Sequence, residues 1–218
     1  MGSDYRESSL EYWNGVHKPI ERDAIPTDDW LDLFEDIIKR TEKPVLDLGC
    51  GTGNDTLYLV ERGRKVISCD QSENAIGNIV KNFPEVEAKC FNMLDGLPFE
   101  DASFDLVIAD LCLHYFDEAD TAAIIAEIAR VLTPGGHLIF RVNSINDVNH
   151  GAGQGRELGH HLYESGSKTM KRFFDEEDIR SFFKAFEIEY LKEEIMSRYR
   201  LEKRLYRVCC RLPEEKDA

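Results

Sequence analysis

The segment from Val45 to Asp55 constrains this chain more than any other, because it reads VLDLGCGTGND. Apolar residues lead into an acid, and glycines then follow at positions 49, 51 and 53. This pattern is typical of a short buried strand, a tight turn and the start of a helix. Glycine lets a backbone adopt positive φ beside a ligand, and the first amides of a helix attract anions. The segment therefore predicts a nucleotide-type cofactor site, and a turn that binds nothing is the alternative reading.

Composition sets the limits of the fold and of the partners. The 218 residues suffice for one α/β domain with a sizeable core. No apolar run approaches the roughly 18 residues of a membrane helix, and the polar N-terminus shows no secretory signal. We therefore expect a cytoplasmic protein without a membrane partner. The net charge of −15 repels phosphate backbones, so we expect no nucleic-acid partner. The six cysteines lack C-x-x-C spacing, and we expect no metal site.

Strand and helix patterns alternate through the middle of the chain. Such alternation predicts right-handed βαβ units and a parallel sheet covered on both faces. The expected strands are 45–48, 65–69, 86–91, 104–109 and 137–142, and the expected helices are 54–62, 72–82 and 118–132.

Both ends of the chain depart from this alternation. An amphipathic helix is expected at 28–40, with Thr27 as its N-cap. Residues 143–171 are rich in glycine and too long for an ordinary connection, which favours a functional lid. A helix at 175–185 precedes two strands, 187–195 and 203–211, which predict a hairpin that adds one antiparallel strand.

A second acid lies at the end of the next expected strand. Asp70 closes the run Val66-Ile67-Ser68-Cys69-Asp70. A carboxylate at this place can accept hydrogen bonds from the ribose hydroxyls of a cofactor laid across the glycine turn. A charge at the N-terminus of the 72–82 helix is the alternative role.

Further segments identify a family. Residues 97–107 read LPFEDASFDLV, residues 110–116 read DLCLHYF, and residues 132–140 read LTPGGHLIF. Together with the glycine motif, they resemble the class I S-adenosylmethionine (SAM)-dependent methyltransferases, especially small single-domain members that act on small molecules. The resemblance covers residues 44–143 and extends to the C-terminal third in layout only.

The resemblance implies a fold and a cofactor site. The fold is α/β, a Rossmann-like doubly wound sheet of seven strands, mostly parallel. It divides a single domain into an N-terminal helical cover (1–43), a SAM-binding core (44–143), a lid or substrate loop (144–171) and a C-terminal helix with a β-hairpin (172–218). The implied cofactor-binding residues are Asp47, Gly49, Cys50, Gly51, Gly53, Asp70, Gln71, Asn92, Met93, Asp110 and Leu111. Asn92 stands where the family commonly has an aspartate that contacts adenine, and its amide carbonyl can accept from the same NH₂ group.

The resemblance also places His114 and Tyr115 beside the reacting methyl group, as candidate catalytic residues. Histidine is the natural base near neutral pH. His17 and His137 are expected to lie away from the site. On the substrate side we expect residues of the N-terminal cover and of the lid, although packing on the core and a solvated loop are the alternatives: Tyr12, Trp13, His150, Arg156 and Tyr163.

The predicted function is transfer of a methyl group from SAM to a small-molecule acceptor by in-line displacement, with S-adenosylhomocysteine as product. A SAM-binding protein without transfer activity is one alternative. A nicotinamide-dependent oxidoreductase is another, and the G-x-G-x-G spacing argues against it, since dinucleotide folds use G-x-G-x-x-G. The acceptor and the oligomeric state cannot be read from this sequence.

Overall fold

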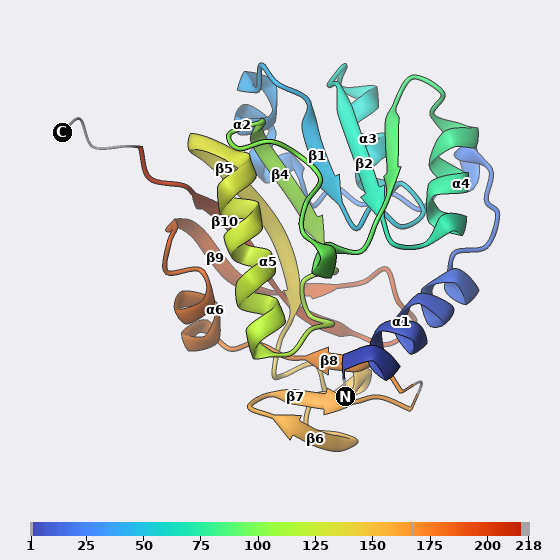
Figure 1. The fold of residues 1–218 in the computed structure, drawn as a ribbon, viewed down its shortest axis with the longest axis vertical. Helices are drawn as coiled ribbons and strands as arrows, with labels where there is room; N and C mark the ends of the chain where they lie inside the picture. The colour runs from blue at the N-terminus through green and yellow to red at the C-terminus, as the bar shows by residue number, and fades with distance from the viewer. Residues whose placement is uncertain (1, 167, 215–218) are drawn as a thin grey trace.

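The computed structural model describes residues 2–166 and 168–214. Within these ranges the strands form a main sheet of seven and a small sheet of three (Figure 1). The main sheet contains β1 (Val45–Leu48), β2 (Val66–Asp70), β3 (Glu87–Cys90), β4 (Phe104–Asp110), β5 (Leu132–Asn143), β9 (Glu187–Met196) and β10 (Lys203–Arg211). The small sheet contains β6 (Arg156–Gly159), β7 (Leu162–Glu164) and β8 (Met170–Arg172).

The order of the main sheet is β3-β2-β1-β4-β5-β10-β9. All neighbouring pairs up to β5 are parallel, whereas β10 runs antiparallel to both β5 and β9. This confirms the predicted mostly parallel α/β sheet with one antiparallel strand from the C-terminal hairpin. The chain proceeds from β1 to one side through β2 and β3, then crosses to β4 on the other side. Ligands of open α/β sheets bind at such a reversal, beyond the carboxyl ends of the strands.

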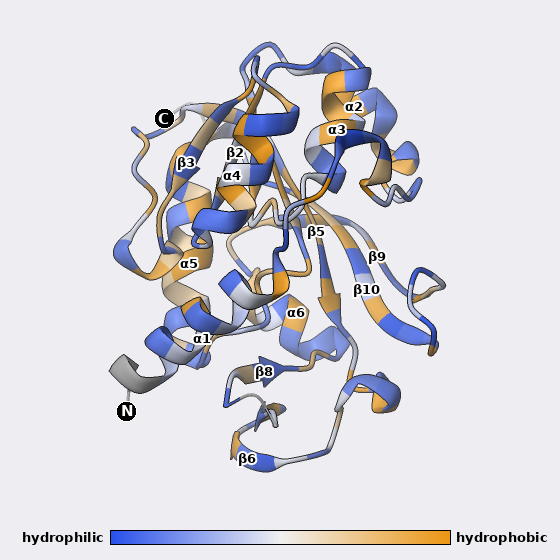
Figure 2. Cartoon of the chain, turned by 90° about the vertical axis from the view of Figure 1, so that its right-hand side faces the viewer, coloured by the Kyte–Doolittle hydropathy of each residue, from blue (hydrophilic) through white to orange (hydrophobic). Residues whose placement is uncertain are grey.

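Helices cover both faces of this sheet. They are α2 (Glu35–Arg40), α3 (Asn54–Glu61), α4 (Glu73–Asn82), α5 (Glu118–Val131) and α6 (Glu176–Phe182). Alternate residues of β4 point to opposite faces. Val107 and Ala109 pack in the core cluster of α5 and α6, and Leu106 and Ile108 pack in that of α2 and α3. In Figure 2 the interior strand β5 is largely hydrophobic, as a strand buried on both faces requires.

The helix expected at 28–40 is shorter than predicted. A 3₁₀ turn at Asp32–Phe34 precedes α2, so Thr27 is not its cap. The indole N–H of buried Trp30 donates to Asp55 Oδ1 at 2.8 Å, which holds the preceding backbone against α3. Tertiary packing therefore overrides the local helical pattern here.

The strand expected at 137–142 begins earlier. Leu132 pairs with Phe104 and His137 pairs with Leu106, so residues 133–136 form an irregularity within β5. Pro134, Gly135 and Gly136 occupy this irregularity.

The segment expected to be a loop folds into the small sheet, with a 3₁₀ turn at Val148–His150 before it. Its last strand is tied to the main domain, because the amide of Arg172 donates to the carbonyl of His114 at 2.7 Å.

The N-terminal helix α1 (Gly2–Val16) lies beyond the carboxyl ends of the parallel strands, between α4 and the small sheet (Figure 1). Polar contacts fix it at both sides: Ser72 Oγ donates to Asn14 Oδ1 at 2.8 Å, and Tyr5 donates to Glu164 at 2.5 Å. None of the helices in the described part of the chain is long and apolar enough to cross a membrane.

Candidate active site

The glycine turn after β1 adopts the conformation that its sequence requires. Gly49, Gly51 and Gly53 have φ values of +75°, +52° and +94°. A Cβ added at Gly49 would lie 2.5 Å from Cys112 Cβ, and one added at Gly51 would lie 3.1 Å from His17 Cε1. The turn therefore needs glycine both for its backbone angles and for the close approach of these neighbours.

Asp70 at the tip of β2 is bound to the same turn. Its carboxylate accepts from the backbone amide of Gly51 at 3.0 Å and from that of Ser72 at 2.9 Å. These bonds fix the orientation of both carboxylate oxygens, each of which keeps lone pairs for a further donor.

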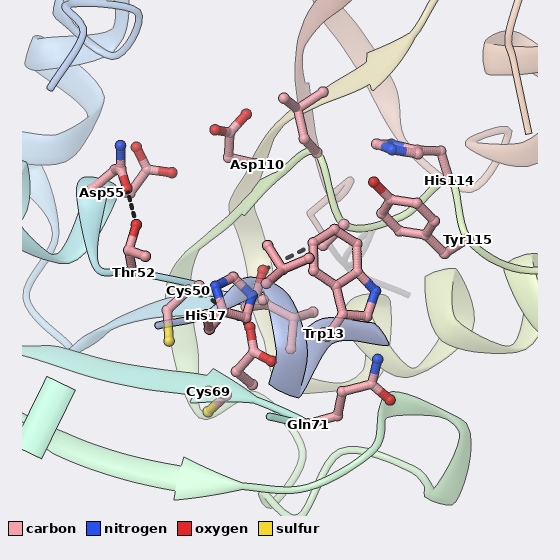
Figure 3. A pocket seen from close by; sticks show the side chains of 18 of the residues that line it. Trp13, His17, Cys50, Thr52, Asp55, Cys69, Gln71, Asp110, His114 and Tyr115 are labelled. Atoms are coloured by element: carbon pink, nitrogen blue, oxygen red, sulfur yellow. Dashed lines mark hydrogen bonds between the residues drawn. The ribbon is translucent and has the colours of Figure 1, made fainter. Parts of the chain in front are cut away.

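A cavity of about 400 Å³ opens at this end of the sheet (Figure 3). Most of the predicted cofactor residues line it: Gly49, Cys50, Gly51, Asp70, Gln71, Asn92, Met93, Asp110 and Leu111. Trp13, His114 and Tyr115 line it as well. The structure thus brings together residues from the ends of β1, β2 and β4 and from the cover formed by α1.

Two of the predicted cofactor residues are not among the described lining of the cavity. Asp47 is buried behind the turn and accepts from the Thr56 hydroxyl at 2.5 Å. Burial raises the pKa of Asp47 to about 7. Gly53 instead allows α3 to pack closely, because a Cβ there would meet Ile79 and Phe83 at 2.9 Å.

The amides of Asn92 and Gln71 form one chain of hydrogen bonds. Asn92 Nδ2 donates to Gln71 Oε1 at 3.1 Å, and Gln71 Nε2 donates to Ser9 Oγ in α1 at 3.1 Å. The Asn92 carbonyl accepts from the amide of Leu94 at 2.9 Å, so an adenine amine would share this acceptor. These hydrogen bonds link α1, in the N-terminal cover, to residues that line the cavity.

Asp110 is held by an arginine that our sequence reasoning missed. Arg141 in β5 donates to both carboxylate oxygens of Asp110, at 2.6 and 2.7 Å, and to Asp28 at 3.1 Å. Its guanidinium also lies 4.3 Å from the centre of the Trp30 ring. A charged residue within the apolar run LIFRV was the available signal, because arginine is almost never fully buried unless it is paired.

His114 and Tyr115, which follow β4, have strongly shifted pKa values. The His114 side chain is 1% exposed, and its Nδ1 has no hydrogen-bond partner among the described residues. Burial, together with the charges of Lys203 and Lys171, holds the pKa of His114 well below its usual range. Burial raises the pKa of Tyr115. In Figure 3 both polar groups turn toward the side of the cavity where Asp110 lies.

Aromatic rings close the cavity from the side of α1. The Trp13 ring stacks on His17 with centroids 5.5 Å apart and meets Tyr115 edge-on at 5.0 Å. His17, which we expected to be a bystander, lines the cavity, and its Nδ1 also has no partner within the described structure. Its position just after the helix gave no sequence signal for this contact.

The other residues predicted on the substrate side do not belong to the described lining. Tyr12 contacts the Trp13 ring edge-on from outside. Arg156 pairs with Glu164 at 2.5 Å, and Tyr163 packs against Phe173. The ring nitrogen of His150 lies 3.3 Å from the carbonyl of Leu201.

The cavity instead receives residues from the hairpin of β9 and β10, namely Arg198, Tyr199 and Lys203. Our sequence reasoning assigned no role to this hairpin beyond its strands. The charged residues at its turn and the tyrosine between them were the only local signal.

Three possible metal ligands meet elsewhere, although we expected no metal site. His160, His161 and Asp178 bring one ligand atom each within 4.8 Å of the others. Asp178 Oδ2 accepts from His161 at 2.7 Å, and Asp178 also takes part in the capping box of α6. These bonds already engage the Asp178 carboxylate.

Comparison with known proteins agrees with this geometry. A family described as "Methyltransferase domain" matches residues 45–136. An uncharacterized methyltransferase of Mycobacterium tuberculosis is 33% identical over 175 residues, which are 79% of this chain and 67% of that protein. One from Synechocystis is 39% identical over 92 residues, which are 42% of this chain and 43% of that protein.

Two further proteins are similar to this chain, one in sequence and one in structure. The Drosophila melanogaster tRNA N(3)-methylcytidine methyltransferase is 31% identical over 150 residues, 63% of this chain and 46% of that protein. A crystal structure of a SAM-dependent methyltransferase from Methanosarcina mazei superposes with a TM-score of 0.70 at 22% identity, covering 84% of this chain and 98% of that one. This likeness shows the shared fold.

The fold, the glycine turn and these matches define an enzyme class that uses SAM as cofactor. The chain belongs to the SAM-dependent methyltransferase family.

Proposed function

We propose that the methyl acceptor of this enzyme is a small molecule, which enters the cavity beside His114 and Tyr115. The observation that carries the proposal is the cover over the cavity, where the Trp13 ring lies against Tyr115 and His17. A cavity of about 400 Å³ lies within the range of small-ligand sites, about 300–1,000 Å³. A covered cavity of this size suits a small acceptor better than a polymer.

The cavity residues fit the cofactor. The buried ring nitrogens of His17 and His114 line it without a partner in the described part of the chain, which is unusual unless a ligand or water satisfies them. The amides of the glycine turn and the Asp70 carboxylate would hold the ribose and the amino-acid part. Asn92 and the backbone of Met93 would hold the adenine.

When bound, SAM supplies a methyl group activated by the positive sulfonium. The chain then has to hold the acceptor in line, and positioning of this kind can contribute about 7–11 kcal/mol. Because the pKa of His114 is lowered, its imidazole is neutral at pH 7 and can accept a proton from a hydroxyl or amine acceptor. The raised pKa of Tyr115 keeps its hydroxyl protonated, so it can donate a hydrogen bond that orients the acceptor.

The acceptor class can be tested with SAM that carries a labelled methyl group. The full chain is incubated with a low-molecular-weight cell extract and, separately, with bulk tRNA. We expect label in small molecules and none in tRNA, and Asp70→Asn should suppress the transfer. Label confined to tRNA would overturn the proposal, and so would an absence of transfer to the extract.

Transfer to tRNA is the second candidate, because the Drosophila relative is named for that activity. The net charge of −15 opposes it, since binding to nucleic acid depends on lysine and arginine contacts with phosphates. The same experiment separates the two candidates.

A further inference from the structure

The end of the cavity near His114 collects cationic side chains although the chain as a whole is acidic. Arg198 and Lys203 line the cavity from the β9–β10 hairpin. The two cations flank one ring, because Arg198 Cζ lies 5.6 Å and Lys203 Nζ 5.7 Å from the centre of Tyr199. Figure 3 shows the polar groups of His114 and Tyr115 turned into the cavity, and the charge of Lys203 acts on His114.

Arg198 has donors to spare. Its nearest carboxylates, Asp28 and Asp110, lie 3.8 and 3.9 Å away, within ion-pair range but beyond hydrogen-bond distance. Arg141 already binds both of them, at 3.1 and 2.6 Å. Among the residues that the structure describes, the guanidinium of Arg198 therefore donates no hydrogen bond, although it carries five N–H groups.

Lys203 also has a hydrogen-bond donor without a partner among the described residues. Its side chain is 6% exposed, and its ammonium donates to Asn143 at 2.6 Å and to Asp147 at 3.1 Å. An ammonium has three donors, so one is left for the cavity. Burial lowers the pKa of Lys203, and the charge of Arg198 adds to this shift, which places the two cations within electrostatic reach.

The carboxylates that line this cavity are already engaged. Asp110 accepts two hydrogen bonds from Arg141, and Asp70 accepts from the amides of Gly51 and Ser72, whereas Arg198 and Lys203 are the cations of the described lining. Asp55 also lines the cavity, but burial raises its pKa well above the usual range and favours its neutral form. Cations with free donors are matched by a ligand that brings an anionic oxygen.

We propose that Arg198 and Lys203 form a carboxylate-binding subsite, and that the methyl acceptor therefore carries an anionic group. This inference rests on the small-molecule function proposed above. The methionine part of the cofactor has the same chemistry, since it also ends in a carboxylate. The experiment must therefore distinguish an acceptor carboxylate from that of the cofactor.

The acceptor is probed with matched pairs on the full chain saturated with S-adenosylhomocysteine. Benzoate is compared with benzamide, and indole-3-acetate with indole-3-acetamide, by calorimetry. We expect at least one carboxylate to bind about tenfold more tightly than its amide, as a charge-assisted hydrogen bond provides. Arg198→Gln should remove this preference. Lys203→Gln should weaken it, provided that its melting temperature shows a folded protein.

The matched control is Arg200→Gln, because Arg200 lies on the same hairpin turn, is exposed and does not belong to the described lining. It removes the same charge and should keep the preference. The proposal is overturned if neither carboxylate binds, if the amides bind equally well, or if Arg200→Gln acts like Arg198→Gln.

The cofactor arm compares S-adenosylhomocysteine with 5′-methylthioadenosine, which lacks the amino-acid part. If Arg198→Gln weakens binding of the first compound alone, the subsite serves the cofactor and the inference about the acceptor is wrong. If the unmodified chain binds neither compound, the failure lies with the methyltransferase site itself. A cofactor role of the subsite and a missing methyltransferase site thus give different binding results.

Discussion

The carboxylate of Asp70 accepts a hydrogen bond from the backbone amide of Gly51 at 3.0 Å, so the tip of β2 is fastened to the turn that follows β1. The two residues come from neighbouring parallel strands, 19 positions apart in the chain. The contact therefore orders both the turn and the acid before any ligand arrives. Such preorganisation lowers the free-energy cost of ordering the site when a ligand binds.

Asp70→Ala should therefore weaken binding of S-adenosylhomocysteine strongly. It removes a carboxylate placed for two ribose hydroxyls, and hydrogen bonds to charged groups contribute about 1.5–3 kcal/mol each. Calorimetry measures the loss of affinity. The control is Asp23→Ala, because Asp23 is an exposed acid in the 3₁₀ turn Arg22–Ala24. Unchanged affinity in a folded Asp70→Ala protein would show that the ribose lies elsewhere.

A comparison of Gly49 with Gly63 separates the cost of steric crowding in the glycine turn from the cost of backbone strain. Gly49 and Gly63 have similar φ values, +75° and +70°, but only Gly49 faces a close neighbour, Cys112. Alanine at Gly63 should cost about 1–2 kcal/mol of stability from strain alone. Alanine at Gly49 should cost about 1–3 kcal/mol more from overpacking. Urea unfolding of both variants gives the difference, and equal losses would contradict a steric role for Cys112.

Breaking the buried pair of Arg141 should destabilise the fold markedly. Arg141→Met leaves Asp110 and Asp28 without their main partner, and removal of one member of a buried pair typically costs about 3–5 kcal/mol. The exposed pair of Arg180 and Glu176 provides the control, since Arg180→Met should change stability by less than about 1 kcal/mol. If the Arg141 variant unfolds at the same urea concentration as the parent, the pair is not a structural element.

Much of this architecture could be predicted because its determinants are local. The glycine turn, the acid at the end of β2 and the alternation of strands and helices are encoded within short windows, and the mostly parallel sheet followed from them. Arg141, Arg198 and His17 were missed because their contacts join segments far apart in the chain. The small sheet was read as a loop, since its strands of three and four residues are too short for a clear period.

Asp47 should give the protein a characteristic dependence of stability on pH. Its pKa is raised from 3.8 to about 7 by burial, so the folded state binds a proton more tightly than the unfolded state. The stabilisation is fully present below pH 3.8 and is lost as the pH rises through about 7. Asp47→Asn should remove a slope of up to about 1.4 kcal/mol per pH unit within this window. Urea unfolding of parent and variant at several pH values tests this, and an equally steep slope in the variant would contradict it.

His114 lines the cavity, and its lowered pKa keeps the imidazole neutral and able to accept a proton, so we expect it to act as a general base. Once a labelled acceptor is found, His114→Ala should lower turnover by roughly 10²-fold while affinity for S-adenosylhomocysteine changes little. His114→Gln keeps a polar group and much of the volume, so it should restore stability without restoring turnover. A purely structural histidine would behave differently, because His114→Ala would then lower the melting temperature and leave the folded fraction fully active. Turnover, affinity and melting temperature measured on both variants decide between these roles.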